Sequence, residues 1–331
     1  MKEAAPQAEH NKNMHDYSRR RFLRGAAHAV TLASLMGVAG KSLDMGYDAL
    51  RADTTFSLEK ISDPSAERLH PHTAWVMVPG FNMAWKDSRE MAEALQPGFS
   101  PYAQTFWLGY QNSDFSPRNM ICKTIDNLHT NKITATYLYG HSFGGMLALE
   151  LANALVEDGI RVPGIILDST PSSYKHVQVP EPILRAVAGG ALTNGVRMVA
   201  ETASIHQMDF KASLQATTAA TNATRASNEL LRESAAYIMQ FLPHNLATTN
   251  LYNTDIAYIG STNDEFVNTS YSRNAWSESL HKAKTFNFYD SSPASHASPR
   301  GDTSIYLATI EKFMNRYDPP VLRRPLDWRM H

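Results

Sequence analysis

The fold is decided by residues 136–145, which read TYLYGHSFGG. The aromatic, aliphatic and β-branched side chains of Thr136–Tyr139 are typical of a buried strand. The strand runs into Gly140–Gly144, which fits the pattern G-x-S-x-G, and apolar residues then recur at helical spacing as far as Glu157. A serine between a strand and a helix stands on a sharp turn, for which small neighbours leave room. We therefore expect the Ser142 hydroxyl to project above a sheet at a helix N-terminus, where amide N–H groups favour negative charge.

Apolar runs alternate with helical patterns on both sides of this motif. Such alternation predicts an α/β fold with crossover connections and a mainly parallel sheet. Residues 172–250 interrupt the alternation with helical periodicity and Ala- and Thr-rich stretches. An insertion of this length between two core strands predicts a helical cap or lid, with extra helices packed on the sheet as the alternative. Strands are expected at 73–78, 105–108, 136–139, 162–167, 256–259 and 285–289, an antiparallel edge strand at 55–61, and helices at 120–129, 145–157 and 304–315.

The composition is that of an ordinary globular protein. The 331 residues are 43% hydrophobic and 10% aromatic, which is ample for a core. Lys and Arg number 31 against 32 Asp and Glu, so the net charge is -1 and no basic field is available for nucleic acid. The single cysteine, Cys122, excludes an intramolecular disulfide and a cysteine-rich zinc site. It falls on a predicted helix, where we expect a small buried residue.

A basic block precedes a mildly apolar run near the N-terminus. Ser18–Arg24 reads SRRRFLR, and the residues from Gly25 to Gly40 are mostly small or apolar. This is the layout of a secretory signal, and the block resembles the twin-arginine export signal, with a simply basic arm as the alternative. We therefore expect a signal peptide at 1–40, recognised by the twin-arginine export machinery, and a periplasmic or extracellular bacterial domain at 41–331. No later stretch is apolar for long enough to predict a membrane span in the mature form.

With its strand–turn–helix motif, the stretch from residue 73 to residue 317, apart from the insertion, resembles the α/β-hydrolase family. The resemblance implies an eight-stranded, mostly parallel sheet with helices on both faces. It also implies hydrolysis by a serine, an acid and a histidine that follow one another in this order along the chain. Ser142 is the nucleophile that the resemblance implies.

The histidine of such a triad should follow the last strand, in the loop before the C-terminal helix. His296 lies there, after the strand at 285–289, and is the expected general base. The nearest rival, His281, precedes that strand. Position along the chain therefore selects His296 from 13 histidines.

Two aspartates end strands at places from which a carboxylate can reach that histidine. Asp264 follows the strand at 256–259 and is the expected acid, since its D-x-x-V setting is similar to the common placement in the family. Asp168 follows the strand after the Ser142 helix, a position from which some thioesterases of this fold take their acid. Glu265 is a third candidate. The acid would accept the imidazole Nδ1–H, fix the tautomer and stabilise the imidazolium.

The oxyanion hole of the family uses two main-chain N–H groups. One belongs to the residue after the nucleophile, here Phe143. The other belongs to the turn after an early strand, where this chain has Phe81. Pro79 stands where the common pattern has a histidine, but Gly80 still permits a tight turn. We expect the N–H groups of Phe81 and Phe143 to bind the tetrahedral oxygen.

Together these residues predict an exported serine hydrolase that cleaves an ester or related acyl bond through an acyl-enzyme. The expected substrate is a small acyl or ester compound, and the apolar insertion favours a lipophilic group. No cofactor, metal or nucleic-acid partner is implied. One alternative is a thioesterase, because Gly140–Ser169 is similar to thioesterases that unload carrier proteins; carrier proteins are cytoplasmic, which argues against this alternative. Another alternative is a non-catalytic binding protein on a hydrolase fold.

Overall fold

The structure is a computed structural model, and all the residues it describes belong to one compact unit, Asp53–Ala191 with Ala223–His331. The predicted signal at 1–40 and the predicted oxyanion donor Phe81 lie outside the described residues. The described residues are 56–80, 83, 85–110, 115–179, 181–189, 228–241, 248–292, 294, 296, 299 and 303–316.

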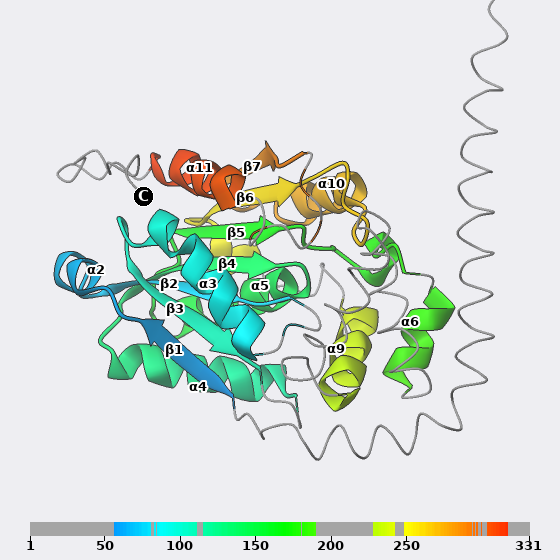
Figure 1. Ribbon diagram of the computed structural model, residues 1–331, viewed down its shortest axis with the longest axis horizontal. Coiled ribbons are helices and arrows are strands. Elements are labelled where there is room, and N and C mark those ends of the chain that lie inside the picture. The colour runs from blue at the N-terminus through cyan, green and yellow to red at the C-terminus, as the bar shows by residue number, and fades with distance from the viewer. Residues whose placement is uncertain are drawn as a thin grey trace, which may run out of the picture. The chain divides into compact units, whose positions relative to one another are not determined.

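Seven strands form one sheet in the order β1-β3-β2-β4-β5-β6-β7 (Figure 1). Strand β1 pairs antiparallel with β3, and every other neighbouring pair is parallel. The prediction of an α/β fold with a mainly parallel sheet and an antiparallel edge strand is confirmed. The described part of the chain holds seven strands, where the family resemblance implies eight. The strands are β1 (Ser57–Ile61), β2 (Thr73–Val78), β3 (Gln104–Gly109), β4 (Ala135–His141), β5 (Gly164–Asp168), β6 (Asp255–Gly260) and β7 (Thr285–Asp290).

Helices connect the parallel strands, and two of them begin at side chains that cap free N–H groups. Asp63 accepts hydrogen bonds from the N–H groups of Ser65 and Ala66 at the start of α2, and Ser116 accepts one from Asn119 at the start of α4. A proline in the first turn favours each start, because its missing N–H costs nothing there. The helices are α2 (Pro64–Leu69), α3 (Trp85–Phe99), α4 (Pro117–Thr130), α5 (Phe143–Glu157), α6 (Glu181–Ala188), α9 (Asn228–Gln240), α10 (Thr269–Ser279) and α11 (Thr303–Met314), with 3-10 helices η1 (Tyr174–His176) and η3 (Thr248–Leu251).

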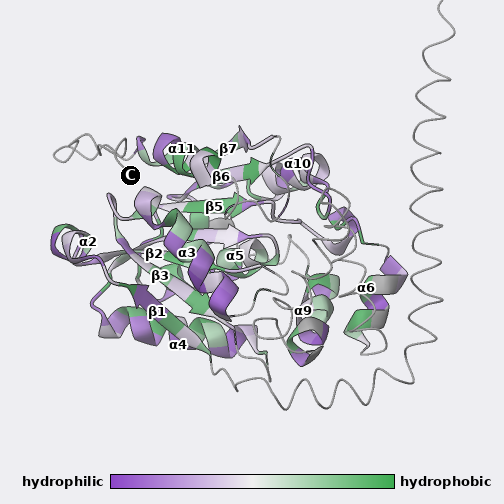
Figure 2. Ribbon diagram, viewed as in Figure 1, coloured by the Kyte–Doolittle hydropathy of each residue, from purple (hydrophilic) through white to green (hydrophobic). Residues whose placement is uncertain are grey.

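Helices α3 and α11 contact each other and cover one face of the sheet, while α5 lies against β2, β4 and β5. The core under α3 and α11 is rich in aromatic side chains. The ring of Trp75 stacks on Phe99 at 4.6 Å and on Tyr137 at 5.0 Å. Helix α3 is hydrophilic on its outer side, whereas α5 is buried along most of its length (Figure 2). The sheet that carries Ser142 is therefore fixed by helix packing on both faces.

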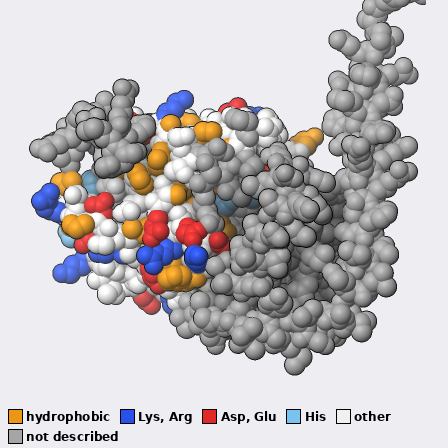
Figure 3. Space-filling model, viewed as in Figure 1, with side chains coloured by type: hydrophobic (Ala, Val, Ile, Leu, Met, Phe, Trp, Pro, Cys, Tyr) orange, Lys and Arg blue, Asp and Glu red, His pale blue; other side chains and the backbone are white. Residues whose placement is uncertain are grey.

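Charged side chains of both signs are interspersed on the described surface in Figure 3. On α3, Arg89 pairs with Glu93 at 2.8 Å and Lys86 with Glu90 at 3.7 Å, each one helical turn apart. Such exposed pairs contribute little to stability, about 0.3–0.5 kcal/mol each. Their mixed signs match the near-zero net charge of the whole chain.

Part of the predicted cap at 172–250 is described, namely η1, α6, α9 and η3. Helices α6 and α9 contact each other. Residues 190–227 and 242–247 of the insertion lie outside the described residues. Among the helices that are described, none has the length and hydrophobicity that a membrane crossing needs. Among the described side chains of α6 and α9, the buried ones are Leu184, Val187, Leu230, Ser234, Ala235 and Ile238.

Candidate active site

Ser142 stands at the turn between β4 and α5, where the sequence predicts a sharp bend. Its φ of 51° and ψ of -125° are sparsely populated by residues other than glycine. Main-chain hydrogen bonds hold this strained conformation: the Ser142 N–H donates to the Asp168 carbonyl at 2.7 Å, and the Gly145 N–H donates to the Ser142 carbonyl at 3.0 Å. The turn is thus fixed by the neighbouring strand β5 and by the first turn of α5.

Glycines surround the serine because other parts of the backbone come too close for a Cβ atom. A Cβ on Gly140 would lie 2.4 Å from the Cα of Gly145, and one on Gly144 would lie 2.2 Å from the Val78 carbonyl oxygen. Contacts this short would force the backbone to shift. The glycines of the motif are therefore required by the close packing of β4 against α5, and of α5 against the end of β2.

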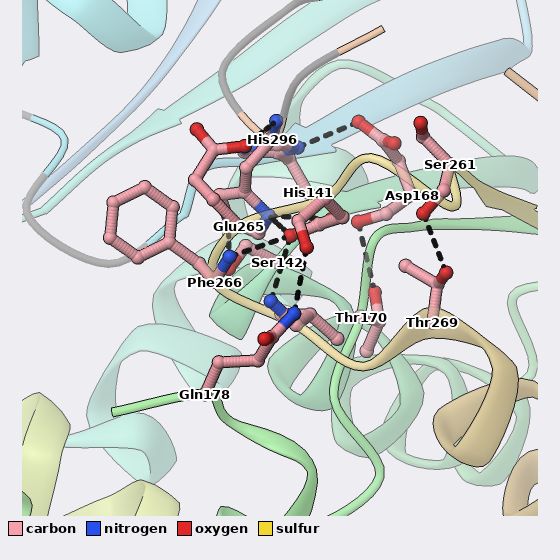
Figure 4. Close-up of polar contacts among 12 residues, drawn as sticks. His141, Ser142, Asp168, Thr170, Gln178, Ser261, Glu265, Phe266, Thr269 and His296 are labelled. Atoms are coloured by element: carbon pink, nitrogen blue, oxygen red, sulfur yellow. Dashed lines mark hydrogen bonds and ion pairs between the residues drawn. The ribbon is translucent and has the colours of Figure 1, made fainter. Parts of the chain in front are cut away.

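Ser142, His296 and Asp264 lie in hydrogen-bond contact, and Figure 4 shows Ser142 and His296 with their neighbours. His296 Nε2 is 2.9 Å from Ser142 Oγ, and His296 Nδ1 is 2.9 Å and 3.1 Å from the two carboxylate oxygens of Asp264. Because Nδ1 donates to the carboxylate, Nε2 is left to accept the serine proton. The structure thus brings together Ser142, the expected base His296 and the expected acid Asp264.

The carboxylate of Asp264 is held in place by its own loop. Its Oδ1 accepts the N–H groups of Phe266 at 2.9 Å and Val267 at 2.7 Å, and the Gln178 side chain donates to its main-chain carbonyl at 2.7 Å. Asp264 is 5% exposed. These bonds leave the second oxygen, Oδ2, to face His296.

Burial and charge oppose each other in the His296–Asp264 pair. Burial favours the neutral form of each group. The electrostatic attraction between the two groups and their hydrogen bond favour the charged forms, and together they outweigh burial. The pKa of Asp264 is therefore lowered, with help from the Val267 N–H and the Ser169 hydroxyl. The pKa of His296 is raised for the same reason, with smaller contributions from Asp168 and Glu265. The pair is built to hold a carboxylate and to stabilise an imidazolium.

The other candidate acids bind different groups. Asp168 accepts a hydrogen bond from His141 Nδ1 at 2.6 Å, and Glu265 accepts the main-chain N–H of His296 at 3.2 Å. Of the three carboxylates, Asp264 bonds to the imidazole of His296. Across the described ranges, no group of three or more His, Cys, Asp or Glu side chains is arranged to hold a metal ion.

Comparison with known families decides the assignment of the chain. The profile of the thioesterase domain matches residues 120–299, which is more than half of the 331 residues. The protein belongs to the thioesterase family. The matched range includes Ser142, Asp168, Asp264 and His296, whereas the turn at Gly80 precedes it.

Solved structures place this thioesterase-family protein in the α/β-hydrolase fold. A putative aryl esterase from Burkholderia cenocepacia aligns with a TM-score of 0.56 and 12% identity, over 79% of this chain and 94% of that one. An enol-lactonase from Burkholderia xenovorans aligns with a TM-score of 0.54 and 11% identity, over 78% and 96%. An esterase from Exiguobacterium antarcticum aligns with a TM-score of 0.55 and 13% identity, over 78% and 95%. Identities this low show the fold alone, and no curated protein sequence matches the chain.

In this thioesterase-family protein, the structure describes one of the two predicted oxyanion-hole donors. Phe143, one predicted donor, is the first residue of α5 and is buried. Phe81, the other, lies outside the described residues, so its role stays a prediction. Gly80 directly before it is described, and a Cβ there would lie 3.4 Å from the Cβ of Ser142. Gly80, the described residue before Phe81, therefore lies beside the nucleophile.

Aromatic rings from the core and from the insertion meet at Phe143. Its ring lies 5.4 Å from Tyr237 of α9, 5.8 Å from Phe115 and 6.1 Å from Tyr110. Tyr237 also contacts Phe241 at 5.7 Å. We call these five residues the aromatic cluster. It places apolar surface next to the residue that follows the nucleophile.

Sequence reasoning missed three residues at this thioesterase-family site. His141 lies inside the G-x-S-x-G motif, so its place at the end of β4 was available as a signal. Gln178 and Tyr237 come from the insertion, where no motif marks them. Their contacts depend on how the insertion folds back onto the sheet, which periodicity does not reveal.

Proposed function

We propose that this protein hydrolyses acyl esters or thioesters through a covalent acyl-enzyme on Ser142. The observation that carries the proposal is the hydrogen-bonded chain from Ser142 through His296 to Asp264, with 2.9 Å at each link. A serine hydroxyl is a weak nucleophile until an aligned base removes its proton. Membership of the thioesterase family and the esterases among the similar structures support the same class of reaction.

The chemistry follows from this alignment. Ser142 Oγ attacks the acyl carbon while His296 Nε2 takes its proton, and the carbonyl oxygen becomes an oxyanion held by the N–H groups of Phe143 and Phe81. The imidazolium, stabilised by Asp264, then protonates the departing alcohol or thiol. In the second half, His296 activates a water that attacks the acyl-enzyme, and the acid product leaves with Ser142 regenerated.

The proposed acyl group is lipophilic, because the aromatic cluster packs around Phe143. Tyr237 brings an apolar ring from the cap, and its truncation removes surface that a long acyl chain would contact. We expect Tyr237→Ala to raise KM for octanoyl esters, because each methylene in an apolar pocket is worth about 1–3 kcal/mol. An acetyl group has no methylene, so acetyl ester hydrolysis should stay within about twofold of wild type. Steady-state kinetics over an acyl-length series tests this. Equal losses on both substrates would contradict it.

Oxoesters and thioesters are distinguished by a matched substrate pair. A thiol is a better leaving group than an alkyl alcohol, so a thioester depends less on proton donation by His296. The test compares a thioester and an oxoester with the same acyl group. A higher kcat/KM on the thioester would favour the narrower activity that the family name suggests. The reverse ratio would favour a carboxylesterase.

Labelling with a fluorophosphonate probe tests the nucleophile directly. Purified protein should carry one adduct on the peptide that contains Ser142, located by mass spectrometry. Ser142→Ala is the variant that should lose the label, and Ser172→Ala is the matched control, a buried serine beside a different histidine. Folded protein that takes up no label would contradict the proposed reaction and favour a non-catalytic binding protein.

We propose that the protein is exported, on the strength of the sequence pattern at Ser18–Arg24 and the apolar run that follows it. The enzyme would then act in the periplasm or outside the cell. Acyl compounds that reach it there are small molecules rather than acyl groups on cytoplasmic carriers.

A further inference from the structure

A second histidine–carboxylate pair lies beside the triad. Asp168 is the last residue of β5, and its side chain is fully buried. Its Oδ2 accepts hydrogen bonds from His141 Nδ1 at 2.6 Å and from the Tyr139 hydroxyl at 2.8 Å. His141 ends the neighbouring strand β4, where it is paired in register with Asp168. The mechanism proposed above uses neither side chain.

The His141 ring packs against two parts of the site. A Cβ on Gly80 would lie 2.9 Å from His141 Cδ2, so the ring fills the space that a side chain at Gly80 would need. The centre of the same ring is 5.1 Å from that of His296, at an angle of 44°. His141 therefore contacts both the turn that leads to Phe81 and one side of the general base.

The end of β5 also touches the nucleophile and the acid. The main-chain carbonyl of Asp168 accepts the N–H of Ser142 at 2.7 Å. The hydroxyl of the next residue, Ser169, helps to lower the pKa of Asp264. The segment Asp168–Ser169 thus contacts Ser142 and Asp264, and it also contacts His141, whose ring lies beside His296.

We propose that Asp168 and His141 are positioning residues: Asp168 fixes the His141 ring, and the ring fixes the turn at Gly80 and the placement of His296. Asp264 remains the acid that bonds to the base. A buried carboxylate that accepts an imidazole N–H holds the ring in one orientation and one tautomer. An amide in its place accepts only a neutral hydrogen bond, which is about half as strong, so the ring is held less firmly and its contacts with Gly80 and His296 loosen together. The kinetic part of this proposal rests on the proposed function.

Removing the charge of Asp168 should change the pKa of His296, whereas a purely structural role of Asp168 would leave that pKa unchanged. Among the described residues, the charged groups that act on His296 are Asp264, Asp168 and Glu265, and the imidazole of His141 lies beside it. Burial lowers the pKa of His296, and the three carboxylates raise it, Asp264 most strongly. Replacing Asp168 by a neutral residue of the same shape removes one of these negative charges, so it should lower the pKa of His296 even though Asp264 is still present.

The test compares Asp168→Asn with a matched control, Asp255→Asn. Asp255 is also a buried aspartate, but it lies at the amino end of β6, away from the carboxyl ends of the strands that carry the site. There it accepts hydrogen bonds from Lys284 and Thr285. The first readout is titration of the His296 imidazole by ¹⁵N NMR, and the second is kcat and KM on an ester that the wild type hydrolyses. For Asp168→Asn we expect a lower His296 pKa and a kcat about 10- to 100-fold lower at nearly unchanged KM. Asp255→Asn should change neither.

Two results would overturn the proposal. A folded Asp168→Asn protein with the wild-type titration and kcat would show that the pair has no positioning role. A loss as complete as that of Asp264→Asn would instead make Asp168 the acid. If Asp168→Asn does not fold, His141→Asn takes its place. The Asn side chain keeps an N–H donor close to the position of Nδ1 but removes the imidazole ring. A wild-type kcat in that variant would also overturn the proposal.

The NMR titration needs no substrate, so it separates this proposal from the proposed function. A shifted His296 pKa in a protein that neither labels nor hydrolyses any ester would contradict the proposed reaction alone. An unshifted pKa together with the wild-type kcat in an active enzyme would contradict the positioning role alone.

Discussion

At the scale of single residues, the general base must be neutral to accept the proton of Ser142. Activity is therefore present above the pKa of His296 and is lost as the pH falls through it. Burial works to lower that pKa, but Asp264 at 2.9 Å raises it above the ordinary value. We expect the acidic limb of kcat/KM against pH to have its midpoint above about 6.5. A midpoint below that value would contradict the charge arrangement at the site.

Removing the carboxylate of Asp264 should act on both the rate and the pH profile. In Asp264→Asn, kcat should fall about 10⁴-fold because the imidazole loses its tautomer and orientation. The residual activity should show its acidic limb at a lower pH, since the pKa of His296 is no longer raised by this partner. Asp126→Asn, at an exposed position on α4, is the control that should leave both unchanged. An unshifted limb in Asp264→Asn would mean that another group supplies the charge.

The G-x-S-x-G motif predicted Ser142 and chain order predicted His296, and the structure brings them together. Each follows a strand of a parallel sheet, and such strands end at the same edge. The choice between Asp264 and Asp168 could not be made this way, because β5 and β6 are neighbours and both aspartates end at that edge. Which carboxylate meets His296 depends on side-chain direction, and Asp168 turns to His141 instead.

At the scale of elements, the segment 172–179 is the first part of the insertion that follows the core strand β5. Gln178 pairs with the acid loop twice: its side chain donates to the Asp264 carbonyl at 2.7 Å, and its main-chain N–H donates to the Phe266 carbonyl at 2.7 Å. The cap insertion is thus hydrogen-bonded to the loop that holds the acid.

This connection predicts that Gln178 affects catalysis without touching the reacting atoms. Gln178→Ala should lower kcat about tenfold, because a loosened acid loop orients His296 less well. Gln240→Ala, at an exposed position on α9, should keep the wild-type rate. Steady-state kinetics on one ester compares the two variants. Equal rates would mean that the main-chain bond alone holds the loop.

Helix α4 shows where sequence patterns fail at this scale. Its buried residues Met120, Thr124 and Leu128 recur every four positions, so one stripe faces the sheet. Cys122 falls between them on the opposite side and is exposed, so the prediction of a buried cysteine was wrong. Residue type favours burial, but helix phase decides it.

At the scale of the whole molecule, the sequence alone supports export, and that proposal has a direct test. Replacing Arg19 and Arg20 together by lysine keeps the charge and removes the twin-arginine pair. We expect the double variant to stay in the cytoplasm of a bacterial host, measured by fractionation and immunoblot. Lys2→Arg with Lys12→Arg serves as the matched control. Normal export of the double variant would contradict the assignment.

The order of the strands has a consequence for how the chain becomes an enzyme. Ser142 and His296 are 154 positions apart, and strands β6 and β7 must pair before the base reaches the nucleophile. Contacts between such distant residues form slowly, because the loop between them must close first. During synthesis the serine turn leaves the ribosome long before its histidine. Catalytic competence is therefore a late event in folding, and recovery of activity after denaturation reports the docking of the last two strands.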